Sequence, residues 1–178
     1  MYRLVVVVQC ILEIIKDFLN EKVQGTVVAS AKVIRPTVLR SIAGDFASDI
    51  LGRTFGPFQR QGKFLLAELS GDRRLVIDPM LTGALQFCEP KLRVLKKTCF
   101  SLGLNGGEEL RYLDDRQMGL VYYVTGDQMS EVPRLDDQGA DVLSGLSLEE
   151  FRSRLTRFHG EIKGVLTRGA FISGIGNA

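Results

Sequence analysis

The residues best suited to approach a phosphate stand near the end of the chain. Gly174-Ile175-Gly176-Asn177 follows Ile162-Lys163 across a short apolar segment. Glycines before an asparagine suit a tight turn whose backbone N–H groups can come close to a phosphate. Only Ala178 follows, at the point where such a turn would normally lead into a helix. We therefore expect this chain to represent part of a longer protein.

Charge is distributed unevenly along the 178 residues, although the formal net charge is only +2. Residues 53–97 hold nine basic and four acidic residues, a net charge of +5. Residues 108–141 hold nine acidic and three basic residues, a net charge of −6. A basic half beside an acidic half fits a protein with one face for a polyanion. Two solvated surfaces of opposite sign are the alternative.

The cysteines and the single histidine do not predict a metal site. Cys10, Cys88 and Cys99 have no metal-like spacing and indicate buried or free thiols in a reducing compartment. His159 has no cysteine or second histidine close to it in the sequence. We expect no cofactor in this chain.

The apolar run near the N-terminus does not predict a membrane span or a secretory signal. It begins at Leu4, and polar residues interrupt it before Ile15. A spanning helix needs about 20 apolar residues. Arg3 is the only basic residue before the run, and the small residues at 29–31 lie too far away for signal cleavage. We expect a cytoplasmic protein without a membrane partner.

The first elements are predicted to be an amphipathic helix and a strand. Apolar residues recur at helical spacing over residues 11–23, and Gly25 suits the C-terminal end of that helix. Residues 26–34 are rich in β-branched side chains, which predicts a strand that Arg35-Pro36 ends. This helix and this strand would form part of the scaffold that positions the functional residues of the later motifs.

From residue 52 onward, short apolar segments separated by turns predict six or seven strands. Asn105-Gly106-Gly107 is the strongest turn signal and predicts a hairpin. Many short strands after one helix indicate an α+β fold that is mainly β, a β-sandwich with helical additions. The predicted strands cover residues 63–69, 75–77, 84–88, 98–104, 108–113 and 120–124.

A second, helical unit is predicted after residues 127–144, an acidic, proline-containing stretch that we interpret as a linker. The sequence from Ser147 to Glu150 matches a capping box and opens a helix. Gly160 ends that helix, and another short helix is expected near Glu161. The first helix has an apolar stripe of Leu148, Phe151, Leu155 and Phe158, and an opposite face with Arg152, Arg154 and Arg157.

Four motifs, in their order and spacing, resemble one enzyme family. They are RQGKFLL at 60–66, IDPMLTG at 77–83, LRYLDDRQMG at 110–119, and IK at 162–163 with GIGN at 174–177. These motifs are similar to RRGKYLL, HLGMTG, LRFxDPRRFG and IKxxLLDQxxxxGIGN of the formamidopyrimidine-DNA glycosylase (Fpg) and endonuclease VIII family. Each motif alone is weak, but four in the right order are specific.

The resemblance implies a DNA glycosylase and abasic-site lyase of base excision repair, which removes oxidised bases from duplex DNA and nicks the abasic strand. It implies a helix-flanked N-terminal β-sandwich at 1–138 and the truncated start of a helix–two-turn–helix DNA-binding domain at 145–178. We expect this chain to lack the zinc finger that usually follows in the family. The implied partner is double-stranded DNA with oxidised or abasic lesions, in the nucleoid. We expect a monomer, with aggregation as a consequence of truncation.

The resemblance assigns Lys63 a contact with a phosphate near the lesion and a role in elimination. An ammonium group is a suitable point charge for a phosphate. Without the resemblance, an exposed strand lysine of no special function would be the preferred interpretation.

The resemblance also assigns three side chains to the space that an extruded base leaves behind. They are Leu81, Arg116 and Met118. A one-residue shift would exchange Leu81 with Met80. The alternative is that Leu81 and Met118 are ordinary core residues. Gln117 replaces the second arginine of the family pattern.

Further positions match residues that grip DNA phosphates in the family. Lys163 and Asn177 match groups that flank the flipped nucleotide, and Gly176 lets the chain approach closely. Arg157 is expected to add to this surface. Lys97 stands where the family has a DNA-contacting histidine.

The nucleophile of the family is a mature N-terminal proline, with a glutamate next to it. Its secondary amine attacks the sugar C1′ to form a Schiff base, and the carboxylic acid helps to protonate the opening sugar. Aligning the family start PELPEVE on Glu13 places Val7 and Val8 at the proline and glutamate positions. Neither Met1 nor Lys63 is an obvious substitute. We hypothesise that residues 2–10 are not the native start.

Three functional interpretations follow. The first is a glycosylase and lyase by descent, represented by a damaged or truncated chain. The second is a non-catalytic module that binds damaged DNA, and the third is a β-sandwich with an unrelated binding role. Borohydride trapping on an abasic duplex separates the first two, because it requires a Schiff base. We predict no trapping but weak, salt-sensitive duplex binding for this chain.

Overall fold

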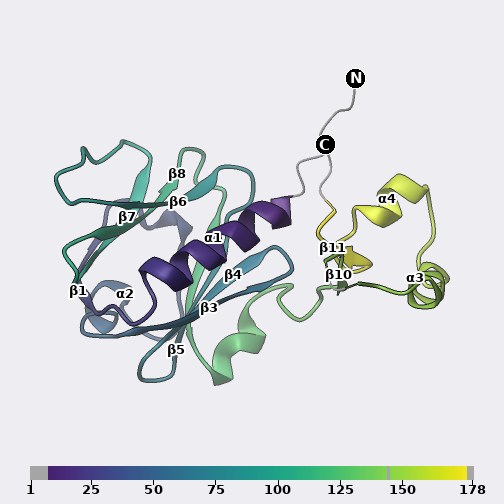
Figure 1. Cartoon of the computed structure of the whole chain (residues 1–178), viewed down its shortest axis with the longest axis horizontal. Coiled ribbons are helices and arrows are strands. Elements are labelled where there is room, and N and C mark those ends of the chain that lie inside the picture. Colours follow the sequence, from purple (N-terminus) through teal and green to yellow (C-terminus); the bar gives the residue numbers. More distant parts are fainter. Residues whose placement is uncertain (1–7, 144, 176–178) are drawn as a thin grey trace.

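The computed structural model describes residues 8–143 and 145–175 (Figure 1). The helices are α1 (Val8–Lys22), η1 (Pro36–Val38), α2 (Phe46–Asp49), η2 (Asp127–Glu131), α3 (Leu148–Leu155) and α4 (Ile162–Leu166). The strands are β1 (Val28–Val33), β2 (Leu39–Ser41), β3 (Phe55–Gln61), β4 (Phe64–Leu69), β5 (Arg73–Asp78), β6 (Gly83–Cys88), β7 (Thr98–Leu104), β8 (Glu109–Asp114), β9 (Leu120–Thr125), β10 (Ala140–Asp141) and β11 (Ile172–Ser173).

These elements form a large β lobe and a small, mainly helical lobe (Figure 1). In the large lobe, a five-stranded sheet has the order β2-β9-β5-β4-β3 and a four-stranded sheet has the order β1-β7-β8-β6. The pairing is antiparallel except between β2 and β9. The predicted hairpins and the α+β, mainly β sandwich are confirmed. In the small lobe, β10 and β11 pair in parallel beside α3 and α4.

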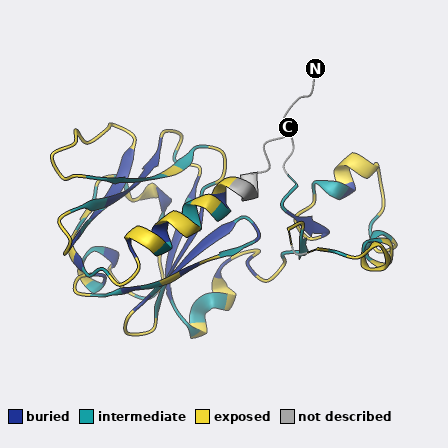
Figure 2. Cartoon of the chain, viewed as in Figure 1, coloured by how far each residue is buried: buried dark blue, intermediate teal, exposed yellow. Residues whose placement is uncertain are grey.

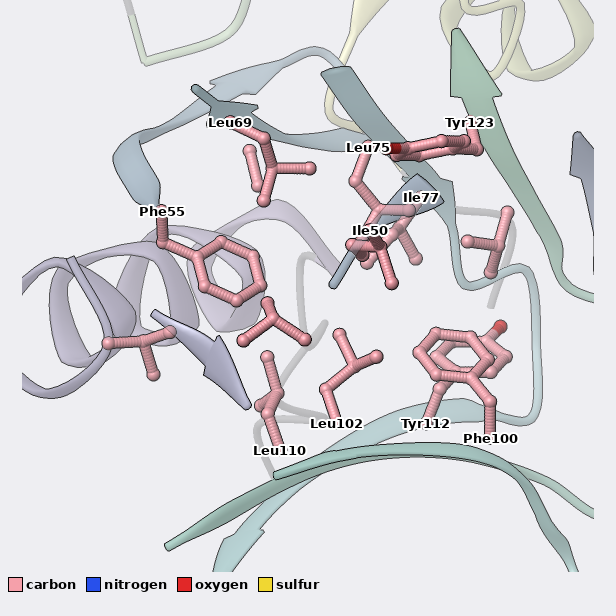
Figure 3. Close-up of a cluster of buried hydrophobic side chains, with 14 of the residues drawn as sticks. Ile50, Phe55, Leu69, Leu75, Ile77, Phe100, Leu102, Leu110, Tyr112 and Tyr123 are labelled. Carbon is pink, nitrogen blue, oxygen red and sulfur yellow. The ribbon is translucent and has the colours of Figure 1, made fainter. Parts of the chain in front are cut away.

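The main core lies between the two sheets (Figure 3). Leu75 and Ile77 of β5 face Leu102 and Leu110 of the opposite sheet. Tyr112 stacks on Phe100 with ring centres 5.5 Å apart. Alternate residues of each strand enter this layer, as expected for strands that bury one face.

Helix α1 packs along the sandwich, with exposed residues along its outer side (Figure 2). Leu12 and Leu19 lie on the inner side of the helix and are buried. The side chain of Asn20 bonds the backbone of Phe58 twice, accepting from its N–H at 2.8 Å and donating to its carbonyl at 2.9 Å. The predicted helix over 11–23 is confirmed, with an earlier start at Val8. In the described part of the chain, no helix is long and apolar enough to cross a membrane.

The interpretation of residues 127–144 as a linker is wrong for the first part of that stretch. Val132 and Leu135 are buried in a second apolar cluster on the outer face of the five-stranded sheet. They pack there with Leu66 and Val76, whose side chains point away from the main core. The polar composition of the segment gave no sign of this contact, because only Val132, Leu135 and the partly buried Met129 pack against the cluster.

The small lobe has its own apolar cluster around Phe171 and Val165. Phe151 and Phe158 pack edge to face against Phe171, with their ring centres 5.4 and 5.2 Å from that of Phe171. The predicted capping box is confirmed, because Ser147 and Glu150 bond each other's backbone N–H groups. The predicted apolar stripe is wrong at one position, since Leu148 is 64% exposed.

Asp49 predicts a specific acid sensitivity of the large lobe. Burial raises its pKa, but hydrogen bonds from Tyr123, Arg53 and Arg73 outweigh burial and lower the pKa to about 2. A depressed carboxyl pKa stabilises the fold above the unfolded value near 4, and this contribution is lost as the pH falls towards 2. We expect Asp49→Asn to lower the unfolding free energy by about 2 kcal/mol at pH 7.

Urea denaturation from pH 7 to pH 2 checks this expectation. The difference in unfolding free energy between the wild type and Asp49→Asn should become smaller below pH 4. Asp136→Asn controls for the loss of one surface charge, because Asp136 is exposed. A difference that stays constant down to pH 2 would contradict the assignment.

Candidate nucleic-acid interface

Lys63 lies in the tight turn of the β3–β4 hairpin, one residue before β4 begins. The turn requires Gly62, whose φ of +58° lies in the left-handed region. The Lys63 ammonium group forms an ion pair with Asp78 and lies 5.0 Å from the centre of the Phe64 ring. The ammonium group at the hairpin tip is therefore already paired with the Asp78 carboxylate.

Asp78 ends β5 and is only 3% exposed. It stands where the pattern HLGMTG has its histidine. Its Oδ1 atom accepts a hydrogen bond from the backbone N–H of Met80 at 3.2 Å. Met80 has a φ of +50°, so the chain turns sharply at this point. Asp78 thus connects the lysine hairpin to the loop that displays Leu81.

Asp114 organises the neighbouring loop between β8 and β9. It is fully buried and accepts hydrogen bonds from the backbone N–H groups of Arg116 at 3.2 Å, Gln117 at 3.0 Å and Gly119 at 2.7 Å. It also accepts a hydrogen bond from the hydroxyl group of Thr82. One buried carboxylate therefore joins the Leu81 loop to the Arg116 loop.

The tips of these two loops are apolar and exposed. Leu81 is 78% exposed and Met118 is 39% exposed. The alternative that these two side chains belong to the core is therefore wrong. Arg116, two residues before Met118, is also exposed, and its guanidinium group has no ion-pair partner among the described residues. Two apolar wedges and one free guanidinium suit insertion into a base stack.

Lys97 lies beside the same loop, because its carbonyl accepts the backbone N–H of Asp114 at 2.8 Å. It ends the long connection between β6 and β7, residues 89–97. Arg111, which is fully buried, holds this connection by donating to the carbonyl groups of Leu92 at 3.0 Å and Pro90 at 3.4 Å. This role of Arg111 has no local sequence signal, because the two carbonyl groups lie 19 and 21 residues earlier in the chain.

A pocket of about 270 Å³ lies where the two lobes meet. We call it the junction pocket. Lys63, Asp78 and Leu81 line it from the large lobe, and Gly174 and Ile175 line it from the small lobe. The structure thus brings the lysine hairpin, one wedge loop and the first half of the GIGN motif to a single concavity.

Other predicted site residues are not part of this pocket. Arg157 lines a separate surface hollow with Arg154 on α3. Lys163 lies on α4, one turn before the pocket residue Thr167, whose N–H bonds the Lys163 carbonyl at 3.1 Å. Val7, Gly176 and Asn177 lie outside the described residues, as does the side chain of Val8.

The family assignment follows from comparison with known proteins. Residues 12–121 match the model of the formamidopyrimidine-DNA glycosylase N-terminal domain. The chain belongs to this family. The match runs from within α1 to the start of β9, and it includes Lys63, both wedge loops and the aspartates beneath them.

Curated relatives named formamidopyrimidine-DNA glycosylase extend the similarity beyond the matched domain. The protein from Desulforamulus reducens is 32% identical over 168 residues, which covers 93% of this chain and 61% of the relative. The protein from Pelotomaculum thermopropionicum is 29% identical over 167 residues, which covers 93% of this chain and 60% of that relative. The chain thus spans about three-fifths of the length of these formamidopyrimidine-DNA glycosylases.

Solved structures agree on the fold. A complex of Lactococcus lactis Fpg with DNA containing FAPY-dG has a TM-score of 0.83 at 20% identity, covering 93% of this chain and 63% of that chain. A complex of the same enzyme with DNA containing an abasic site has a TM-score of 0.82 at 21% identity. At these identities the similarity establishes the Fpg fold.

The described residues do not fit the zinc site that the Fpg family usually carries. Within residues 8–143 and 145–175, no group of three or more His, Cys, Asp or Glu side chains could hold a metal ion. Burial raises the pKa values of Cys88 and Cys99, which disfavours their thiolate forms. The expectation of a metal-free chain stays a prediction.

Tyr112 departs from the phenylalanine of the Fpg pattern LRFxDPRRFG, and this departure predicts a stabilising substitution. Its hydroxyl group is buried and has no hydrogen-bond partner in the described part of the chain. Burial and the nearby Asp114 carboxylate raise the pKa of Tyr112 well above its ordinary value, so the hydroxyl stays protonated. An unpaired buried hydroxyl is unfavourable, so Tyr112→Phe should raise the unfolding free energy by about 1 kcal/mol.

Tyr123→Phe is the matched control for this measurement by urea denaturation. Tyr123 is equally buried, but its hydroxyl donates to Asp49 at 2.6 Å. The two substitutions should therefore change stability in opposite directions. Destabilisation by Tyr112→Phe would show that the hydroxyl has a favourable partner.

Proposed function

We propose that this chain recognises damaged duplex DNA as the N-terminal part of a formamidopyrimidine-DNA glycosylase of base excision repair. The observation that supports this most directly is the convergence of the Lys63 hairpin and the Leu81 loop with Gly174 and Ile175 on the junction pocket. The Arg116 loop joins them through Asp114. Double-stranded DNA with oxidised or abasic lesions would be the partner, in the nucleoid, with the protein acting as a monomer.

The chemistry of these groups fits an extruded nucleotide. Enzymes that act on a base in a duplex first remove it from the stack, which leaves a space and an unpaired partner base. Leu81 and Met118 offer flexible apolar side chains for the space, and the guanidinium of Arg116 can bond a base edge. Lys97 and Lys163 provide positive charge for the flanking phosphates, and Arg157, just after the end of α3, lines a separate surface hollow.

Fluorescence anisotropy with a duplex that carries a stable abasic analogue tests the proposal. We expect salt-dependent binding that is tighter than binding to the undamaged duplex. Arg116→Ala should remove most of this preference for damage and leave non-specific binding nearly intact, because phosphate contacts dominate the latter. Arg152→Ala on the exposed face of α3 is the control. Binding that does not depend on salt would contradict the proposal.

A non-catalytic damage-binding module is the second candidate, and two observations favour it. The lysine with an assigned part in elimination is held by a buried carboxylate, Asp78. The alignment places Val7 and Val8 where the family has its catalytic proline and glutamate. Borohydride trapping on an abasic duplex discriminates the two functions. A covalent complex would establish lyase chemistry, whereas damage-selective binding without trapping would support the module.

A further inference from the structure

A second cavity, of about 450 Å³, adjoins the junction pocket at the lysine hairpin. The two share Lys63, Gln138 and Gly169. Arg134 lines the second cavity from the large lobe, and Arg168 lines it from the small lobe. We call it the arginine cavity. Two guanidinium groups from different lobes therefore border one space that continues the junction pocket.

The backbone holds Arg134 in place, although its side chain is exposed. Val132 and Leu135, on either side, are 2% and 1% exposed and anchor the segment to the sheet. Arg134 itself has a φ of +65°, and its carbonyl accepts a hydrogen bond from the side chain of Gln138 at 2.7 Å. A fixed backbone reduces the entropy that an ordered arginine loses when it binds a ligand.

Arg168 is held in the same manner in the small lobe. Its backbone N–H bonds the carbonyl of Val165 at 3.1 Å, and its own carbonyl accepts from Phe171 at 2.9 Å. Both of these neighbours are buried. Within the described residues, neither Arg134 nor Arg168 forms an ion pair. Both guanidinium groups are therefore available to a ligand.

The ionisable groups of the arginine cavity favour an anion. Asp137 is the one carboxylate among its lining residues, and Lys63 is paired with Asp78. Two arginines against one free carboxylate leave a local excess of positive charge. The family pattern IKxxLLDQ has an aspartate at the position of Arg168, so the cation here is a departure of this chain.

We infer that Arg134 and Arg168 form an additional phosphate-binding site, which takes the phosphodiester backbone of the DNA strand that leaves the junction pocket. Planar guanidinium groups bind phosphate oxygens in bidentate fashion, and two of them across the lobe junction would hold the lobes on one strand. This inference rests on the proposed function. It extends the DNA path from Lys63 into the arginine cavity.

The experiment measures the affinity of the whole chain for an abasic-analogue duplex between 50 and 300 mM salt. The double variant Arg134→Gln/Arg168→Gln should bind roughly tenfold more weakly at low salt, and its log–log salt slope should be less negative by about 2. The matched control is Arg74→Gln/Arg152→Gln, which removes the same charge. Arg74 lies near the start of β5, at the end opposite Asp78, and Arg152 lies on α3.

Equal losses in the double variant and its control would overturn the inference and leave the proposed function intact. Absence of salt-dependent binding in the parent chain would overturn both. Arg168→Asp, which restores the family residue, is a second test, since it should weaken binding more than Arg168→Gln. Unchanged urea denaturation of each variant would show that the effects arise from binding.

Discussion

Replacement of Asp114 by alanine is expected to lower the free energy of unfolding by about 3–4 kcal/mol. The Asp114 carboxylate accepts three backbone N–H groups of one loop and the hydroxyl of Thr82. Without it, donors around a buried position lose their acceptor, and buried unpaired donors are strongly unfavourable. Urea denaturation followed by circular dichroism measures the loss.

Asp115→Ala is the control, because Asp115 is adjacent and exposed. It should change stability by less than about 0.5 kcal/mol. The Asp114 variant should also lose the preference for damaged DNA, since the Arg116 loop would no longer be fixed relative to the Leu81 loop. A loss of stability as small as that of the control would show that the loop holds its shape without the carboxylate.

Local sequence patterns predicted most elements, because their signals do not depend on distant residues. The helical spacing of apolar residues gave α1, and the Asn105-Gly106-Gly107 turn gave the β7–β8 hairpin. The capping box at Ser147 gave the start of α3. The motifs also selected Leu81 and Met118, and the structure finds both exposed at loop tips.

The contacts beneath the site could not be predicted in the same way. Asp78 and Asp114 act on groups that the sheets bring together, and Arg111 bonds carbonyl groups 18 to 21 residues earlier in the chain. One signal was available, because an aspartate just before a turn often bonds backbone N–H groups two or three residues later. Both Asp78 and Asp114 do so. The buried positions of Val132 and Leu135 carried no comparable signal.

Asp78 also bears on how this chain binds DNA. Its carboxylate is buried and paired with Lys63, the cation nearest the wedge loop in the junction pocket. A phosphate could recruit Lys63 only by leaving this buried carboxylate without its cation, which is unfavourable. The chain therefore binds DNA, under the proposed function, without full use of Lys63.

Asp78→Asn should release Lys63 and tighten binding to an abasic-analogue duplex by about 10- to 100-fold. Asparagine keeps the oxygen that accepts the Met80 N–H, so the loop should retain its shape. The salt dependence should become steeper by about one phosphate contact, because the freed ammonium group would displace one more counterion. Fluorescence anisotropy over a range of salt concentrations measures both quantities.

The control for this variant is Asp17→Asn. Asp17 is also paired with a lysine, Lys16 at 3.1 Å, but this pair lies on the exposed side of α1. Both substitutions remove one negative charge from a lysine–aspartate pair, but Asp17 is exposed and Lys16 keeps its ion pair with Glu13. A gain in affinity shared by the two variants would reflect net charge alone. A gain in affinity confined to Asp78→Asn would mean that the buried Asp78 carboxylate keeps Lys63 from binding a phosphate. Asp78 would then limit the affinity of this chain for DNA.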